Sequence, residues 1–174
     1  MSENMAFSFG LNVDAELKAD STSSLRADFS NIVLQDLATR KLGNLDITFS
    51  GLRNKTLLDV KAGDLTMKFE GDGGGYTLVD RFSAASGLLV EQIEKHDFNM
   101  VRLNELLPDF RLTIDAKQEN LLNGYLKSNG IRFEQMAIDL GTDVSHDFGL
   151  SSKVYGLNIE GIVLDSVLMY AKQK

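Results

Sequence analysis

The sequence of 174 residues contains no cysteine and a single proline, Pro108. Without cysteine the chain can form no disulfide, no thiolate metal site and no cysteine nucleophile. Ordinary proline usage of about 5 % would place roughly nine prolines in a chain of this length. Because proline removes a hydrogen-bond donor from a β-ladder, its scarcity is typical of long continuous sheets.

Clusters of basic residues and long apolar runs are missing as well. The net charge is −7 and the sequence pI is about 4.8, whereas phosphate recognition needs clustered Lys and Arg, so we expect no nucleic-acid partner. The sequence has no run of the ~18 apolar residues that a membrane-spanning helix requires. Residues Met1–Ala6 lack the regions of a signal peptide and lead directly into a strand pattern, from which we expect a segment cut from a larger protein.

Motifs for catalysis and for cofactors are also lacking. The two histidines, His96 and His146, have no second histidine at metal-ligand spacing, and neither HExxH nor G-x-S-x-G occurs. Gly71–Gly75 is not followed by Lys-Ser/Thr, so it indicates a hairpin loop rather than a phosphate-binding loop. We therefore predict no catalytic residue, no metal site, no cofactor and no enzymatic activity.

A two-residue alternation of apolar and polar side chains dominates the sequence. Its longest run, from Phe7 to Ala19, has apolar residues at every second position and polar residues or glycine between them. Successive side chains of a strand point to opposite faces, so such runs predict strands with one apolar face. The large apolar residues predicted to line that face are Leu45, Ile47, Phe49, Leu65, Met67, Phe69, Phe110, Leu112 and Ile114.

Acidic residues take the alternate positions or the turns. They indicate a solvated outer face, and no D-x-D-x-D-G calcium loop is present. The residues with this interpretation are Asp46, Asp64, Glu70, Asp72 and Asp115.

The period changes from two to that of a helix between Ser83 and Leu107. We predict a first helix, a second helix capped by Asp97 or Asn99, and an end at Pro108. The apolar faces would comprise Ala85, Leu88, Leu89 and Ile93 in the first helix and Leu103, Leu106 and Leu107 in the second. The chain then divides into a first β segment (1–80), a helical insertion (81–108) and a second β segment (109–174), all parts of one domain.

A polar interruption at Asn31 predicts a β-bulge. The segments that begin at Phe29, Phe133 and Ile159 share one outline of apolar and polar residues. This outline suggests that one bulged strand unit is used three times.

Periodicity leaves two architectures open. One is a β-sandwich with a sealed core, which would serve as a scaffold or adhesion module. The other is a long curled sheet, antiparallel or mixed, whose apolar face forms an open groove. Acyl chains would suit such a groove, since each buried CH₂ contributes ~0.8 kcal/mol.

Three segments carry a family resemblance: Leu103–Ile114, Asn120–Leu126 and Ile131–Leu140. Together with the flanking one-sided strands they resemble TamB-type translocation and assembly module proteins of the AsmA-like family. The resemblance implies a groove of the β-taco type in a periplasmic protein anchored to the inner membrane. It implies phospholipid transport between the membranes and outer-membrane protein assembly.

The expected partners follow from that resemblance and from the strand pattern. The resemblance implies phospholipid acyl chains, and an outer-membrane BamA-like barrel bound through parts of the parent protein outside this chain. Because unpaired sheet edges invite pairing, an edge-to-edge homodimer is also expected.

Overall fold

A computed structural model describes residues 6–18, 22–35, 39–97, 99–142 and 147–172. The predictions that concern Ala19 and His146 lie outside these residues. The strands are β1 (Ala6–Leu17), β2 (Ser23–Gln35), β3 (Thr39–Gly51), β4 (Lys55–Ala62), β5 (Leu65–Asp72), β6 (Phe110–Ala116), β7 (Ile131–Arg132), β8 (Gln135–Thr142), β9 (Phe148–Ile159) and β10 (Ile162–Lys172). The helices are α1 (Gly75–Lys95), α2 (Met100–Leu106) and α3 (Leu121–Ser128).

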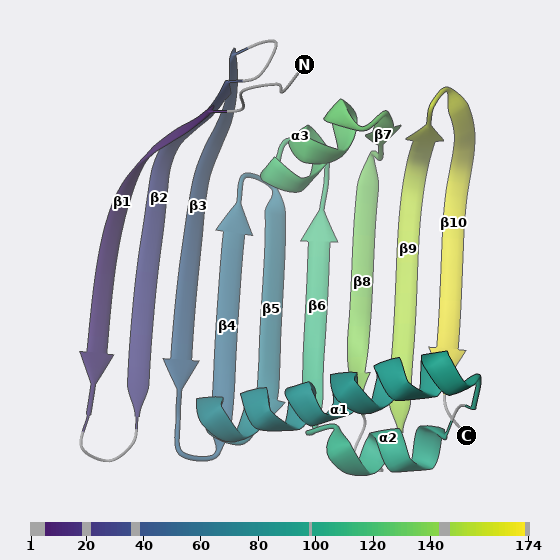
Figure 1. Ribbon diagram of the computed structural model, residues 1–174. Coiled ribbons are helices and arrows are strands. Elements are labelled where there is room, and N and C mark those ends of the chain that lie inside the picture. Colours follow the sequence, from purple (N-terminus) through teal and green to yellow (C-terminus); the bar gives the residue numbers. More distant parts are fainter. Residues whose placement is uncertain (1–5, 19–21, 36–38, 98, 143–146, 173–174) are drawn as a thin grey trace.

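All strands join one antiparallel sheet in the order β1-β2-β3-β4-β5-β6-β8-β9-β10, and the short β7 pairs with β9 (Figure 1). The sheet does not close into a barrel, and β1 and β10 form its two edges. The prediction of a mainly β fold, with a long curled sheet and a helical insertion, is confirmed, and of the two sheet types left open the structure has the antiparallel one. Among the described residues no second sheet faces the first, so the alternative of a β-sandwich is not the architecture found.

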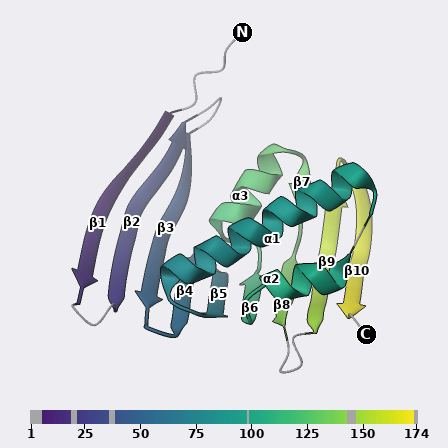
Figure 2. The same cartoon turned by 60° about the horizontal axis from the view of Figure 1, so that its bottom comes forward.

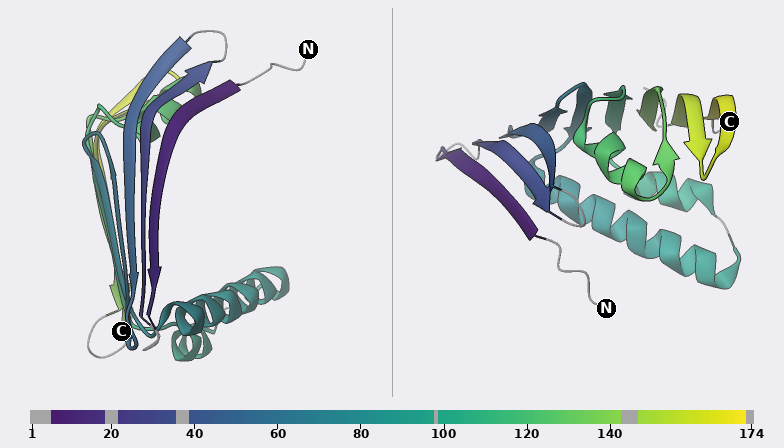
Figure 3. Two further views of the ribbon diagram at one scale, coloured as in Figure 1. Left: turned by 90° about the vertical axis from the view of Figure 1, so that its left-hand side faces the viewer. Right: turned by 90° about the horizontal axis from the view of Figure 1, so that it is seen from above.

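The sheet curls toward the side that carries the helices (Figure 3). The curl is strongest in β1–β3, and the predicted bulge lies in this region: the β2–β3 register shifts between Phe29 and Ile32, and Asn31 has a φ of 53°. A bulge raises the local twist and bends its strand. The prediction of a bulge at Asn31 is therefore confirmed.

The predicted threefold repeat is wrong. The segment after Phe133 crosses the break between β7 and β8. In the segment from Ile159, Glu160 and Gly161 form the two-residue turn of the β9–β10 hairpin, with φ values of 51° and 92°. Two consecutive positive φ angles are what a tight hairpin turn requires, and the similar outline therefore hides three different backbone conformations.

Helix α1 begins at Gly75, before the predicted boundary at residue 81. Its N-cap is Gly74, which provides no side-chain hydrogen bond. Because glycine is a poor helix former, the Gly71–Gly75 segment resembled a loop, whereas its first residues end β5 and its last one opens the helix. The helix starts at the lower end of the sheet, where it contacts β4, and runs away from the sheet with α2 beside it (Figure 2, Figure 3).

The two helices pack through a small core of their own. Ala85, Leu88 and Leu103 are buried there, with Leu106 and Leu107 packed against them. The predicted cap is confirmed, because the Asn99 side chain accepts a hydrogen bond from the Arg102 N–H at 3.0 Å. Two residues of the predicted first-helix face, Leu89 and Ile93, are exposed instead, since the contact with α2 uses a narrower stripe.

Helix α3 is attached to the sheet by a polar network at the β4–β5 turn. The Asp64 carboxylate accepts hydrogen bonds from the N–H groups of Lys117 and Glu119, at 3.2 and 2.8 Å, and from the Asn120 side chain at 2.6 Å. Gly63 has a φ of +63°, and a Cβ there would lie 2.1 Å from the Glu119 carbonyl oxygen. Asp64 lies in a turn and stays partly exposed, as predicted, but its carboxylate also holds two distant segments together.

Asparagine side chains complete the attachment of α3. Asn120 caps the helix by accepting from the Asn123 N–H at 2.8 Å. The fully buried Asn123 donates to the carbonyl oxygens of Lys117, Gln118 and Phe133. These bonds place α3 over the upper end of the sheet, on the same side as α1 (Figure 3).

Candidate functional site

The nine apolar residues predicted to line a groove lie on one face of the sheet. The register aligns Phe49 with Leu58, Leu58 with Phe69, and Phe69 with Leu112, and directly opposed residues share a face. The Phe69 ring also stacks on Phe110, with ring centroids 6.1 Å apart. The structure therefore brings β3, β5 and β6 together as the sequence predicted.

This face is the concave one. Phe82 of α1 contacts both Phe69 and Phe110, with ring centroids 6.0 and 5.2 Å apart. A Cβ placed on Gly71 of β5 would meet Leu78 of α1. Because the helices stand on the side toward which the sheet curls, the apolar residues face into the curve (Figure 3).

The apolar face is wider than the nine predicted residues. Leu58 and Val60 of β4 continue its rows between β3 and β5, and Ile138 and Leu140 of β8 continue them beyond β6. The same alternation marks these strands in the sequence, so the signal was present. What the sequence did not show is that β4 and β8 are the neighbours that complete the rows.

Most of this concave surface is only half-buried. Of the nine predicted residues, Phe110 alone is buried, at 8 % exposed. Toward the β1 edge the surface is open, and Val13 is 50 % exposed. A sealed core would bury such side chains almost completely. The described residues thus form an apolar groove that is covered only near α1 and α3.

Helix α1 adds a second apolar surface. Its side opposite the α2 contact has residues at alternating spacings of three and four, which lie along one face of a helix. These residues are Tyr76, Val79, Ser83, Ser86, Val90 and Ile93. The four apolar members are exposed, and Tyr76 reaches 93 %. In Figure 1, α2 lies below α1, and the exposed stripe is on the side of α1 that faces away from α2.

A hollow of about 850 Å³, here called the α1 hollow, lies where the stripe meets the sheet. It is in the size range of ligand pockets, ~300–1,000 Å³. Its apolar lining consists of Leu17, Phe49, Leu52, Tyr76, Leu78 and Val79. Beside the hollow, two hydrogen bonds join the β3–β4 connection and the start of β4 to the residue before the α1 cap: the Gly73 N–H donates to the Asn54 carbonyl at 2.8 Å, and the Thr56 hydroxyl donates to the Gly73 carbonyl at 2.8 Å.

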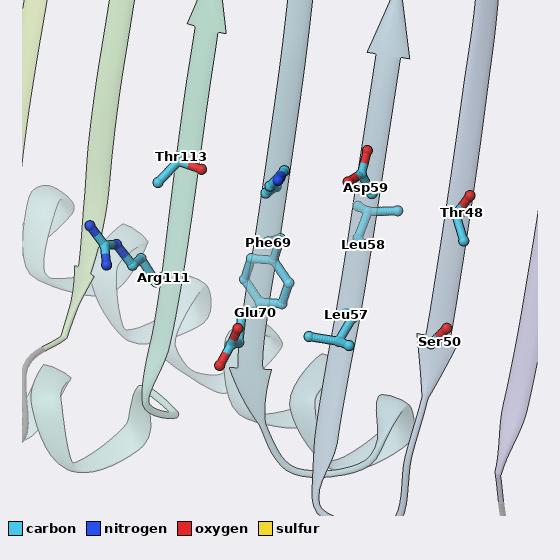
Figure 4. Close-up of a pocket in the computed structure, with 10 residues that line it drawn as sticks. Thr48, Ser50, Leu57, Leu58, Asp59, Phe69, Glu70, Arg111 and Thr113 are labelled. Atoms are coloured by element: carbon cyan, nitrogen blue, oxygen red, sulfur yellow. The ribbon is translucent and has the colours of Figure 1, made fainter.

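The outer face of the sheet is polar and its charges are largely paired. A shallow hollow of about 440 Å³ on this face is lined by Asp59, Glu70, Arg111 and Thr113, among others (Figure 4). Arg111 donates two hydrogen bonds to Asp139, at 3.1 and 2.7 Å, and these bonds hold the pKa of the Asp139 carboxyl below its usual value. This arrangement is typical of a solvated face.

Among the described residues no three His, Cys, Asp or Glu side chains gather to hold a metal ion. His96 ends α1 as its C-cap. In the part of the chain that the structure describes, no helix is both long and apolar enough to cross a bilayer. Comparisons with protein-family models, with curated proteins and with solved structures gave no match.

Proposed function

We propose that this chain is a non-enzymatic segment of a cell-envelope protein that shelters lipid acyl chains in its concave apolar groove. The observation that supports the proposal is the uncovered apolar face, which continues in register from β3 through β8. A soluble protein rarely leaves so continuous an apolar surface without a partner. The exposed stripe of α1 begins at the α1 hollow, which Phe49 of this face also lines.

The binding free energy expected for an acyl chain suits a reversible lipid carrier. Burying about 15 methylene groups at ~0.8 kcal/mol each gives roughly 12 kcal/mol. Association costs of ~4–15 kcal/mol oppose this gain. The remainder corresponds to weak or moderate affinity, which allows a chain to enter the groove and also to leave it. Such exchange is what transport between two membranes requires.

We further propose that the segment has the cellular role that the family resemblance implies. In that role the segment belongs to a periplasmic protein, anchored to the inner membrane and associated with a BamA-like barrel. It serves phospholipid transport and outer-membrane protein assembly. A scaffold or adhesion role without a lipid site is the alternative that the experiment below distinguishes.

The experiment is lipid analysis of the purified chain, by native mass spectrometry and solvent extraction, with displacement of a fluorescent fatty acid in parallel. We expect co-purified lipid and saturable displacement. Met67 is half-buried in the centre of the apolar face, so Met67→Glu places a charge in the groove. This variant should weaken probe binding by tenfold or more, about 1.4 kcal/mol.

The matched control is Lys68→Glu, which introduces the same side chain one residue later. Lys68 is exposed on the outer face of β5, so its substitution should leave probe binding unchanged. Absence of both co-purified lipid and probe displacement would favour the scaffold alternative. Equal losses in the two variants would show that the probe does not occupy the concave face.

A further inference from the structure

We infer that the α1 hollow is a headgroup site, which binds the anionic end of an acyl-chain amphiphile through Arg53 while the chain extends along the concave face. This inference rests on the proposed function and deepens it, because it names the class of ligand and the point where the ligand is held. The observations concern the position, the lining and the charge of the hollow.

The hollow lies at an end of the groove, where the amphiphile's polar end can reach water. Its walls come from the lower ends of β1 and β3 and from the first turn of α1. Leu17 and Phe49 continue upward into the apolar rows of β1 and β3. On the other side, Tyr76 and Val79 begin the exposed stripe of α1. An acyl chain that leaves the hollow therefore meets apolar surface on two sides.

The lining is apolar except for hydroxyl groups and two cations, Lys18 and Arg53, and it includes no carboxylate. Lys18 lies 3.6 Å from the Glu16 carboxylate and is thus partly neutralised. Among the described residues, the Arg53 guanidinium has no ion pair. A cation without an anion, beside an apolar hollow in a chain of net charge −7, is complementary to a negatively charged headgroup.

The turn that carries Arg53 lies against the start of α1. A Cβ placed on Gly74 would lie 3.4 Å from the Arg53 carbonyl oxygen, so the β3–β4 turn packs closely on the start of α1. The first turn of α1 contains no acidic residue, and its N-cap makes no side-chain hydrogen bond. The partial positive charge of this helix end adds to the field of Arg53.

The headgroup chemistry that fits is a small oxyanion, a carboxylate or a phosphate, on a long acyl or alkyl chain. Both present oxygen acceptors that a guanidinium can bind with two parallel hydrogen bonds. A neutral headgroup on the same chain gains the apolar contacts but not this bond. Comparison of charged and neutral amphiphiles of equal chain length therefore isolates the contribution of Arg53.

The test measures displacement of cis-parinaric acid by palmitate, hexadecyl phosphate and hexadecan-1-ol at pH 8. Arg53→Gln should weaken the binding of at least one of the two anions about tenfold, ~1.4 kcal/mol. It should change the affinity for hexadecan-1-ol by less than about twofold. The anion that loses more identifies the headgroup class. Arg53→Lys keeps the charge and should recover most of the affinity.

The matched control is Arg132→Gln, at an exposed arginine of β7, which should alter none of the three competitors. The inference is overturned if Arg53→Gln leaves the affinities for both anions unchanged, or if it lowers the affinity for hexadecan-1-ol by the same factor. Either of these results is compatible with the proposed apolar groove. Failure of the unsubstituted protein to bind any of the amphiphiles would overturn the proposed function together with this inference.

Discussion

Removal of the Asp64 carboxylate should release α3 from the sheet and destabilise the protein. The carboxylate accepts three hydrogen bonds from the segment that leads into α3. A hydrogen bond contributes ~0.5–1.5 kcal/mol net. Asp64 is half-buried, so we take the lower part of that range and expect Asp64→Ala to cost about 2 kcal/mol. In a chain of this size that corresponds to a decrease in Tm of about 4–8 °C.

The same carboxylate makes the free energy of unfolding depend on pH in the acidic range. Burial acts to raise the pKa of Asp64, but the hydrogen bonds from Asn120, Glu119 and Lys117 outweigh it and hold the pKa below the usual 3.8. The ionised form is thus favoured in the folded state, and its contribution is fully present above pH 3.8. The contribution is lost as the pH falls through the lower pKa of the folded protein.

Thermal unfolding followed by circular dichroism, with hydrogen exchange of the α3 amides, measures both effects. Asp115→Ala is the matched control, because Asp115 is an exposed residue of β6. We expect Asp64→Ala to lower Tm and α3 protection at neutral pH, and to converge with the unsubstituted protein as the pH falls below the lowered pKa of Asp64. The reasoning is refuted if Asp64→Ala and its control behave alike at neutral pH, or if their difference persists undiminished in acid.

Two further predictions concern the attachment of α1 and the β10 edge. Phe82→Ala removes the α1 ring that contacts both Phe69 and Phe110. It should cost about 2 kcal/mol in urea unfolding, less than the ~3–5 kcal/mol of buried aromatic truncations, because Phe82 is only half-buried. A cost under about 0.5 kcal/mol would contradict that contact. We also infer that the predicted edge-to-edge homodimer forms through β10, where Leu168 and its neighbour Met169 expose apolar side chains on both faces of an edge strand. Leu168→Lys should then reduce concentration-dependent self-association in analytical ultracentrifugation, whereas a monomer at every concentration would exclude the dimer.

The features that the sequence predicted correctly are local ones. Alternation assigned Phe49, Phe69 and Leu112 to the apolar sides of their strands, because successive side chains of any strand point to opposite faces. The bulge at Asn31 and the cap at Asn99 were likewise recognisable, since each depends on a few consecutive residues.

The beginning of α1 was missed for an equally local reason. Gly74 and Gly75 carry no side chain that could signal a cap or a helical face, so the glycine-rich segment resembled a loop. The exposed Ile93 shows a related limit, because periodicity identifies an apolar stripe but not the surface that will cover it.

The sequence by itself determined that the chain forms one-sided strands with two helical interruptions. Only the tertiary structure decided that these strands join a single open sheet, that its apolar face lies on the inside of the curve, and that this face stays half-exposed. It also joined Asp64 to Asn120, 56 residues later, and brought Phe49 and Arg53 to the same hollow as the start of α1. The physical reason is that strand faces follow from the backbone of each segment alone. Which segments become neighbours depends instead on contacts between residues far apart in the chain, whose free energy must offset the entropy of closing the loops between them.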